Sequence, residues 1–198
     1  PAIGLSAYLL EKKFPNEPIA ILWSDHLVKN DAAFREMLRL AEKQVSSKEA
    51  NFVFITQKPR FANQNLGWIE LGEKVGGESN EALYNFQRLC YRPKLEEAEA
   101  FFADKKYVWN LGYFVTTPSY LTSLFSQYVP DMANKLSTIQ EAYGTDSFEK
   151  VLSENYGELE KISFDDAILV KLGAAGMQVI SADLGWSDVG AWDALKEA

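Results

Sequence analysis

The chain has 198 residues, 47% of them hydrophobic and 24% charged, and its formal net charge is −8 at pH 7. This length and composition suffice for one domain with a substantial apolar core. The acidic balance argues against a nucleic-acid partner, because such proteins normally present a basic face. No apolar run approaches the roughly 20 residues that span a bilayer, so we expect no membrane insertion.

Cysteine usage and the first residues add two expectations. Cys90 is the only cysteine, so no disulfide can form within the chain, which fits a reducing compartment such as the cytoplasm. Residues 1–10, PAIGLSAYLL, contain no Met and read as a helix already under way. We therefore expect that a segment precedes Pro1.

Residues 19–57 are predicted to form a strand, a helix and a second strand. The apolar run 19–23 ends on polar residues, as a buried strand does at its edge. Residues 30–45 carry apolar side chains at helical spacing, and Asn30 can cap that helix. Residues 51–57, NFVFITQ, form a second β-branched run. This order predicts a βαβ unit, a parallel strand pair and an α/β fold.

The remaining elements are predicted from apolar runs and from the residues that typically begin or end helices and strands. Extended segments are expected from Gly67 and over 82–90, 107–117 and 177–183, and helices over 92–106, 118–129, 131–160 with breaks, and 163–173. Ser163 and Asp166 have the spacing of a capping box, and Gly173 marks the end of that last helix. Residues 72–81 read as a polar, glycine-rich surface loop.

Two acids follow predicted strands, Asp25 after the first strand and Asp188 shortly after the last. In open α/β sheets, ligands bind beyond the carboxyl ends of the strands. Two carboxylates that meet there suit Mg²⁺, which is usually held by one or two carboxylates together with substrate phosphates. The alternative is that each aspartate only caps a turn.

Three further polar residues have both a functional and a structural interpretation. Asn110 can bind a sugar hydroxyl through its amide, or it can satisfy a buried backbone group. Arg92 can hold a phosphate, although a surface arginine is the commoner case. His26 is the only histidine, and we favour a hydrogen-bonded structural imidazole over a catalytic base.

Several motifs, in order along nearly the whole chain, are similar to one enzyme family. The most specific is GWSDVGAWDAL at 185–195, and the others are SDH at 24–26, KPRFANQNLGWIE at 58–70, YRPKLEEAEAFF at 91–102, WNLGYF at 109–114 and ISFDDAILVK at 162–171. Together with the opening segment, they resemble the mannose-1-phosphate guanylyltransferases, which make GDP-mannose from GTP and mannose 1-phosphate.

The resemblance implies a fold and a set of site residues. The fold is a Rossmann-like mixed sheet flanked by helices, here lacking its first βαβ region, so that 1–198 form a single partial nucleotidyltransferase domain. Asp25 and Asp188 correspond to Mg²⁺ ligands. Gly67, Arg92 and Asn110 correspond to positions that hold the sugar phosphate, and Asp165 to an acid of less definite role. The implied reaction is attack by the sugar phosphate on the α-phosphorus of GTP.

The chain also departs from the family's pattern. The family's glycine-rich triphosphate loop has no counterpart in these 198 residues, so we expect the isolated chain to be inactive. Tyr91 replaces a family acid, Trp23 stands where proline is usual, and residues 63–66 differ, which leaves open another sugar specificity or a non-catalytic, sugar-nucleotide-binding homologue. A sheet that lacks strands exposes an apolar edge, so we expect the chain to form a homodimer or to need an upstream segment.

Overall fold

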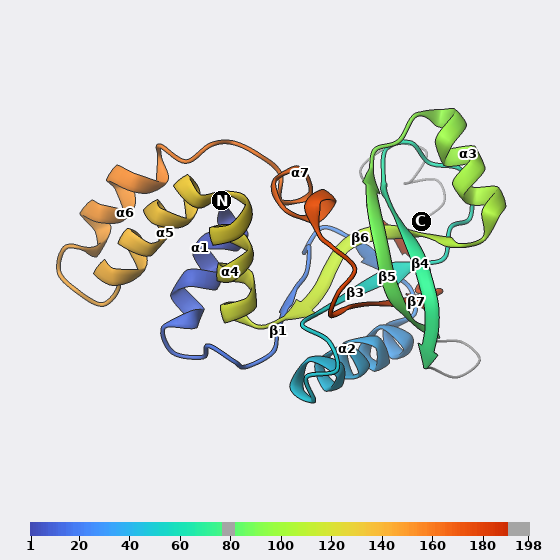
Figure 1. Cartoon of the computed structure of the whole chain (residues 1–198), viewed down its shortest axis with the longest axis horizontal. Helices are drawn as coiled ribbons and strands as arrows, with labels where there is room; N and C mark the ends of the chain where they lie inside the picture. The colour runs from blue at the N-terminus through green and yellow to red at the C-terminus, as the bar shows by residue number, and fades with distance from the viewer. Residues whose placement is uncertain (77–81, 190–198) are drawn as a thin grey trace. The chain divides into compact units, whose positions relative to one another are not determined.

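The structure is a computed structural model, and it describes residues 1–76 and 82–189. The backbone divides into two compact units, labelled here by their main content (Figure 1). The helical unit comprises Pro1–Ile19 and Thr116–Leu172. The sheet unit comprises Ala20–Val115 and the described residues from Gly173 onward.

A mixed, six-stranded sheet forms the centre of the sheet unit. Its strands are β1 (Ile19–Ile21), β3 (Phe52–Gln57), β4 (Gly67–Gly76), β5 (Ala82–Tyr91), β6 (Tyr107–Thr116) and β7 (Met177–Ala182), in the order β1-β6-β3-β7-β5-β4. Strand β4 also pairs with β6. Strands β3 and β7 are parallel, whereas β4 is antiparallel to both β5 and β6. The predicted α/β class with a mixed sheet is therefore confirmed.

Two details of the sheet differ from the sequence predictions. Strand β6 lies between β1 and β3, so the expected βαβ unit does not give two neighbouring strands. Strand β4 continues through Gly76, where a loop from residue 72 was expected. The residues of that segment are polar because they belong to a long antiparallel hairpin whose outer part is exposed, as the exposed side chains of Glu73 and Lys74 show.

Helices α2 (Asp31–Ser46) and α3 (Leu95–Asp104) belong to the sheet unit. Helix α2 begins as predicted, because the side chain of Asn30 accepts a hydrogen bond from the backbone N–H of Ala33 at 3.1 Å. Met37, Ala41 and Val45 of α2 are buried in the same apolar cluster as the sheet tryptophans. This burial anchors the loop between β1 and α2, which carries Asp25.

Aromatic rings from alternate sheet residues form a second apolar group. Phe52 stacks on Phe114 with ring centroids 4.5 Å apart, and Phe54 stacks on Phe86 at 5.1 Å. Rings at these distances contribute packing energy beyond their burial. The group joins β3, β5 and β6, and it fixes the strands whose ends carry the predicted site residues.

The helical unit contains α1 (Ala2–Glu11), α4 (Pro118–Tyr128), α5 (Pro130–Ala142), α6 (Phe148–Tyr156), α7 (Phe164–Ala167) and the 3₁₀ helix η1 (Leu169–Lys171). Helix α1 packs closely on α4 and α5, since a Cβ on Gly4 would lie 2.7 Å from side-chain atoms of both Phe125 and Leu136. The predicted helix over 163–173 is wrong in length. Ser163 does cap α7, but Ile168 leaves the helical region with φ −132°, and only a short 3₁₀ turn follows.

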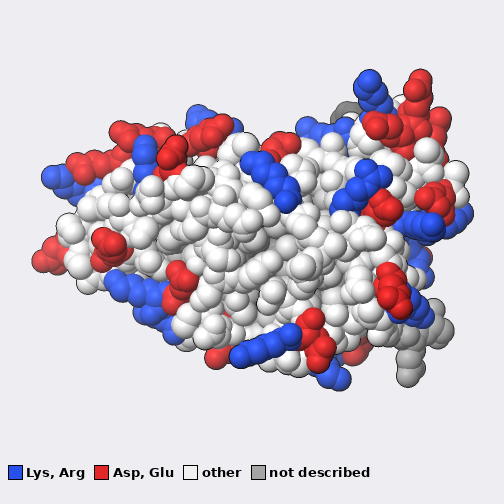
Figure 2. Space-filling view, viewed as in Figure 1, with Lys and Arg blue, Asp and Glu red and all other residues white. Residues whose placement is uncertain are grey.

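Two observations on the described residues concern membrane insertion and nucleic-acid binding, which the sequence argues against. No helix among residues 1–76 and 82–189 is both long and apolar enough to cross a membrane. On the face shown in Figure 2, acidic and basic side chains are interspersed, without an extended basic field.

Candidate functional site

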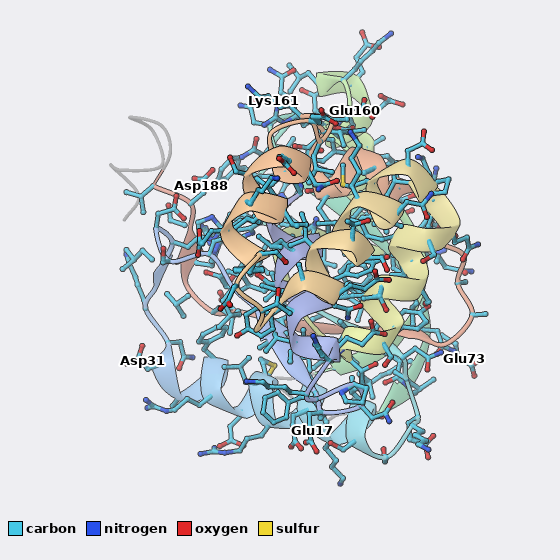
Figure 3. The ribbon with its side chains drawn as sticks, turned by 90° about the vertical axis from the view of Figure 1, so that its left-hand side faces the viewer. Glu17, Asp31, Glu73, Glu160, Lys161 and Asp188 are labelled. Carbon is cyan, nitrogen blue, oxygen red and sulfur yellow. The ribbon has the colours of Figure 1, made fainter. Side chains whose placement is uncertain are left out.

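Two short strands bring together the segments that carry the predicted metal ligands. Strands β2 (Leu27–Val28) and β8 (Trp186–Ser187) form an antiparallel pair, in which Leu27 is opposite Ser187. Continuing that register by one residue puts His26 beside Asp188, and Asp25 is the next residue along. Asp188 is half-buried at the end of the described segment (Figure 3), whereas Asp25 is exposed. Both carboxylates lie close enough to His26 to act on its charge.

His26 is held by two aromatic side chains. Trp186 Nε1 lies 3.1 Å from His26 Nδ1, and Tyr113 Oη lies 3.1 Å from the same nitrogen. An indole N–H can only donate, so Nδ1 acts as an acceptor and the proton of the neutral imidazole is assigned to Nε2. Sequence reasoning favoured a hydrogen-bonded structural imidazole, and the contacts confirm that part of the interpretation.

The surroundings of His26 favour its neutral form. Burial lowers the pKa of His26, and the nearby carboxylates of Asp25 and Asp188 act in the opposite direction without reversing the shift. Burial also raises the pKa of Tyr113, so that its hydroxyl stays protonated. The acids therefore lie near a neutral, hydrogen-bonded imidazole.

Gln57, at the end of β3, fixes the turn that leads to Asp188. Its side chain is fully buried, and its Oε1 accepts the backbone N–H of Leu184 at 2.8 Å. Its Nε2 donates to Asp183 Oδ1 at 2.9 Å, and this hydrogen bond holds the pKa of Asp183 below its usual value. One side chain thus satisfies both ends of the turn. Sequence reasoning missed Gln57, although a polar residue that ends an apolar strand is a signal for such a role.

Arg60 is a second residue that sequence reasoning missed. Its Nη2 donates to the backbone carbonyl of Trp186 at 3.1 Å. Its guanidinium carbon lies 5.3 Å from the centre of the Trp109 ring, within the range of a cation–π contact. Arg60 therefore links β8, which precedes Asp188, to β6, which carries Asn110.

The register of three neighbouring strands gathers the predicted sugar-phosphate residues. Gly67, the first residue of β4, is opposite Tyr91 of β5 on one side and opposite Asn110 of β6 on the other. Arg92 follows Tyr91 directly. Gly67, Arg92 and Asn110 are far apart in the sequence, but they occupy one end of one three-stranded segment. We call this group the β4–β5–β6 end.

Asn110 lies closely against Gly67. A Cβ on Gly67 would lie 3.2 Å from Asn110 Cβ and 3.4 Å from Asn110 Nδ2, so only glycine leaves this amide its present position. Asn110 is 6% exposed, and its Oδ1 accepts the backbone N–H of Gly112 at 3.1 Å. The structural interpretation of Asn110 therefore holds for its oxygen.

Arg92 has a strained backbone and an exposed side chain. Its φ is +48°, in the left-handed region that residues with a Cβ seldom adopt. Its guanidinium carbon lies 5.2 Å from the centre of the Tyr91 ring. Backbone strain at a chain position is often retained for function. The left-handed turn directs the chain out of β5 immediately beside Gly67.

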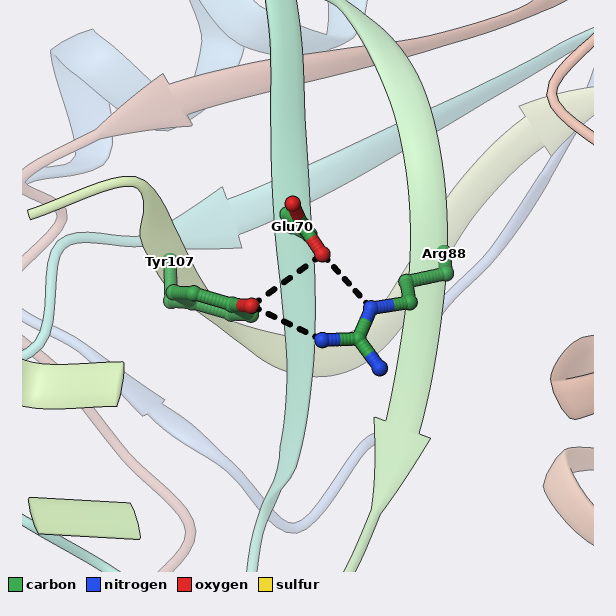
Figure 4. Close-up of polar contacts among 3 residues, drawn as sticks. All are labelled: Glu70, Arg88 and Tyr107. Atoms are coloured by element: carbon green, nitrogen blue, oxygen red, sulfur yellow. Dashed lines mark hydrogen bonds and ion pairs between the residues drawn. The ribbon is translucent and has the colours of Figure 1, made fainter. Parts of the chain in front are cut away.

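A polar contact across the same three strands holds them in register (Figure 4). Arg88 Nε of β5 lies 2.5 Å from Glu70 Oε2 of β4, and Arg88 Nη2 donates to Tyr107 Oη of β6 at 2.9 Å. Tyr107 Oη in turn donates to Glu70 Oε2 at 3.1 Å. The hydrogen bond from Arg88 is the main cause that lowers the pKa of Glu70. This Glu70–Arg88–Tyr107 triad lies three residues along β4 from Gly67.

Asp165 and part of the C-terminal motif fall outside this arrangement. Asp165 lies half-buried on α7 in the helical unit, and not among the residues that the sheet unit gathers. Gly190, Trp192 and Asp193 of the motif at 185–195 lie outside the described residues. A surface cavity of about 430 Å³ in the helical unit, between the start of α5 and residues 158–162, contains none of the predicted site residues.

Asp25 and Asp188 offer two carboxylates as possible ligands for Mg²⁺. Among the described residues, no three His, Cys, Asp or Glu side chains form a group that could hold a metal ion. Two carboxylates nevertheless fit Mg²⁺, because this ion commonly takes its other ligands from water and substrate phosphates. The residues present therefore fit a magnesium ion that binds together with a phosphate-bearing substrate.

Comparison with known proteins gives the same family over the full length. All of residues 1–198 match the nucleotidyl transferase family. A putative mannose-1-phosphate guanylyltransferase of Vibrio cholerae is 30% identical over the whole chain, and a mannose-1-phosphate guanylyltransferase of Escherichia coli K12 is 29% identical. The chain spans 41% of the length of each of these two relatives.

Solved structures agree with this assignment. A Thermus thermophilus protein described as mannose-1-phosphate geranyltransferase is 30% identical, with a TM-score of 0.81 over 98% of this chain and 52% of its own. A Helicobacter pylori protein described as mannose-6-phosphate isomerase shares the fold, with a TM-score of 0.72 at 18% identity over 94% of this chain and 68% of its own. The residues, the mixed sheet and these comparisons lead to one conclusion: the chain belongs to the nucleotidyl transferase family.

Proposed function

We propose that this chain provides the metal-binding and sugar-phosphate-binding part of an enzyme that forms GDP-mannose and pyrophosphate from GTP and mannose 1-phosphate. The observation that carries the proposal is the pairing of Gly67 with both Tyr91 and Asn110, which gathers the predicted sugar-phosphate residues at one end of β4. The names of the relatives from V. cholerae and E. coli support the choice of mannose 1-phosphate.

The proposed reaction is an in-line substitution at phosphorus. A phosphate oxygen of mannose 1-phosphate attacks the α-phosphorus of GTP, a new P–O bond forms, and the bond to the β,γ-diphosphate breaks to release pyrophosphate. Positioning and neutralisation of charge supply most of the catalysis in such transfers. Bound Mg²⁺ would supply charge neutralisation at the phosphates.

Each proposed site residue has a separate task. Asp25 and Asp188 would hold the Mg²⁺, with their position set by the β2–β8 pairing and by Gln57. The amide nitrogen of Asn110 and the guanidinium of Arg92 would donate hydrogen bonds to the sugar phosphate. Gly67 would let the ligand approach the backbone of β4. For Asp165 we propose a part in substrate binding, as the family resemblance implies, without assigning it a specific contact.

A second candidate is a nucleotidyltransferase with a different sugar specificity. Its support is the contact between Arg92 and the Tyr91 ring, at a position where related enzymes carry an acid that could accept a sugar hydroxyl. A site that loses such an acceptor discriminates less strongly between sugars. A non-catalytic homologue that binds a sugar nucleotide is the third reading, since no glycine-rich triphosphate loop occurs in these residues.

Compartment and assembly are also part of the proposal. The one cysteine, Cys90, is a free thiol, which suits a reducing compartment such as the cytoplasm. Burial raises the pKa of Cys90, so this thiol is not an activated nucleophile. We also propose that the chain forms a homodimer.

The experiment is Mg²⁺-dependent pyrophosphate release by residues 1–198, tested with GTP and mannose 1-phosphate. Glucose 1-phosphate and the other nucleoside triphosphates serve as controls for specificity. Because no glycine-rich triphosphate loop occurs in residues 1–198, we expect no turnover by this chain but binding of mannose 1-phosphate or GDP-mannose. Turnover with glucose 1-phosphate in preference to mannose 1-phosphate would favour the second candidate. Absence of any sugar-phosphate binding would contradict the proposal.

A further inference from the structure

Trp23 is a large aromatic side chain that is exposed beside the candidate site. It lies in the segment between β1 and β2, two residues before Asp25, and it is 44% exposed. Burying an indole normally contributes strongly to folding, so an exposed one beside polar ligand-binding groups needs an explanation. By the family resemblance, this position is one where proline is usual.

The indole of Trp23 rests on the bare Cα of Gly112. A Cβ on Gly112 would lie 2.2 Å from Trp23 Nε1, 3.1 Å from Cδ1 and 3.2 Å from Cε2. The five-membered ring therefore occupies the space that any other side chain would fill. Gly112 has φ +72°, so its conformation also favours glycine. The position of Trp23 depends on this glycine.

Gly112 connects Trp23 to the proposed sugar-phosphate residues. Its backbone N–H donates to Asn110 Oδ1, and Asn110 is opposite Gly67 in the sheet. Trp23 therefore borders the β4–β5–β6 end through β6, and its own segment continues to Asp25. The exposed indole thus contacts β6 two residues from Asn110 and lies two residues before Asp25 in the chain.

We propose that Trp23 determines sugar specificity by providing an aromatic surface for the pyranose ring of the sugar phosphate. This inference rests on the proposed function. A pyranose ring has an apolar C–H face that packs on an indole, while its hydroxyls and phosphate need polar partners such as Asn110 and Arg92. The contact of Trp23 with β6 favours the sugar over the nucleobase, because Asn110 and Gly67 are the residues assigned to the sugar phosphate.

The test compares a ligand that has the ring with one that lacks it. Binding of mannose 1-phosphate and of inorganic phosphate to residues 1–198 would be followed by NMR, with the Trp23 indole signal identified by its absence in Trp23→Phe. We expect Trp23→Ala to weaken mannose 1-phosphate binding roughly tenfold and to leave phosphate binding unchanged, whereas Trp23→Phe should stay within about threefold of wild type.

Two further variants provide controls. Phe14→Ala removes another exposed aromatic ring, 49% exposed and in the helical unit, and should change neither affinity. Gly112→Ala should weaken mannose 1-phosphate binding as Trp23→Ala does, because the new methyl displaces the indole. Far-UV circular dichroism verifies that each variant is folded.

The outcomes separate this inference from the proposed function. Equal affinity of wild type and Trp23→Ala for mannose 1-phosphate would overturn the role of Trp23 and leave the proposed function standing. A loss of GTP binding alone in Trp23→Ala would also overturn it, since the indole would then serve the base. Failure of the wild-type chain to bind any sugar 1-phosphate would overturn both.

Discussion

Leu27 and Ser187 are partners in the β2–β8 pair, although they lie near opposite ends of the chain. This pairing brings the segment that carries Asp25 to the segment that carries Asp188, and both carboxylates lie close enough to His26 to raise its pKa against the effect of burial. A site made from two distant segments depends on the residues that hold each segment in place.

Gln57 should control both stability and the position of Asp188. In Gln57→Leu, the buried N–H of Leu184 loses its acceptor, which typically costs about 1–3 kcal/mol of folding free energy. We also expect weaker metal-dependent binding of GDP-mannose, because the turn at 183–186 is no longer fixed. Urea unfolding and a binding titration with Mg²⁺ measure the two effects.

Thr56→Val is the matched control for Gln57→Leu. Thr56 is the preceding residue of β3, is fully buried, and donates its hydroxyl to the carbonyl of Ile180 at 2.8 Å, away from the turn. This variant should lose stability but keep the affinity for GDP-mannose. If both variants bind GDP-mannose as wild type does, Gln57 has only a structural role.

Gly67→Ala should disturb the sugar-phosphate residues directly. The added methyl would lie 3.2 Å from Asn110 Cβ and 3.4 Å from Asn110 Nδ2, tighter than ordinary contacts, so the amide must shift. We expect mannose 1-phosphate to bind about tenfold more weakly, which corresponds to roughly 1.4 kcal/mol. Isothermal titration calorimetry measures this change.

Gly76→Ala provides a control on the same strand. A Cβ on Gly76 would lie 3.8 Å from Leu83, an ordinary contact, and Gly76 is at the other end of β4 from Gly67. Its affinity for mannose 1-phosphate should equal that of wild type. A normal affinity in Gly67→Ala would show that Asn110 does not contact the sugar phosphate from this position.

The Glu70–Arg88–Tyr107 triad predicts a stability change in acid. The pKa of Glu70 is lowered in the folded state, chiefly by its hydrogen bond from Arg88, so the folded chain binds fewer protons than the unfolded chain. The stabilisation is therefore present above the ordinary glutamate pKa of about 4.3 and is lost as the pH falls below it. Thermal unfolding should show Glu70→Gln destabilised relative to wild type at pH 7.

The same comparison in acid distinguishes this interaction from a general effect. The difference in thermal stability between wild type and Glu70→Gln should be smaller at pH 3 than at pH 7. Protonated Glu70 carries no negative charge, so it no longer attracts Arg88 as an anion does. Glu158→Gln is the control, since Glu158 also has a lowered pKa through its ion pair with Lys135 but is exposed in the helical unit. A constant difference between wild type and Glu70→Gln from pH 7 to pH 3 would contradict the prediction.

Local sequence patterns predicted most of the elements but not their arrangement. The predicted caps at Asn30 and Ser163 are local, and each accepts the hydrogen bond that its residue type favours. The placement of β6 between β1 and β3 depends on pairing between distant segments, which periodicity does not report. The early end of α7 is likewise not visible locally, because Ile168 and Leu169 continue the helical spacing although the helix ends at Ala167.

Residues of the candidate site were predicted from the sequence only where they belong to a recognisable motif. Asp25, Asp188, Gly67, Arg92 and Asn110 come from such motifs, and the sheet brings the last three together. Gln57 and Arg60 were missed because their roles come from backbone groups of β8 and its turn, which a linear sequence does not place near β3. Likewise, Trp23 has a partner in Gly112 that only the folded chain identifies.

The most direct test of the central claim is a titration with Mn²⁺, a paramagnetic substitute for Mg²⁺, in the presence of GDP-mannose. Electron paramagnetic resonance would count the ions bound to wild type, Asp25→Asn and Asp188→Asn, with Asp31→Asn as a control on the exposed start of α2. The account predicts one tightly bound ion in wild type and in the control, and its loss in the other two variants. Unchanged Mn²⁺ binding in both Asp25→Asn and Asp188→Asn would contradict it.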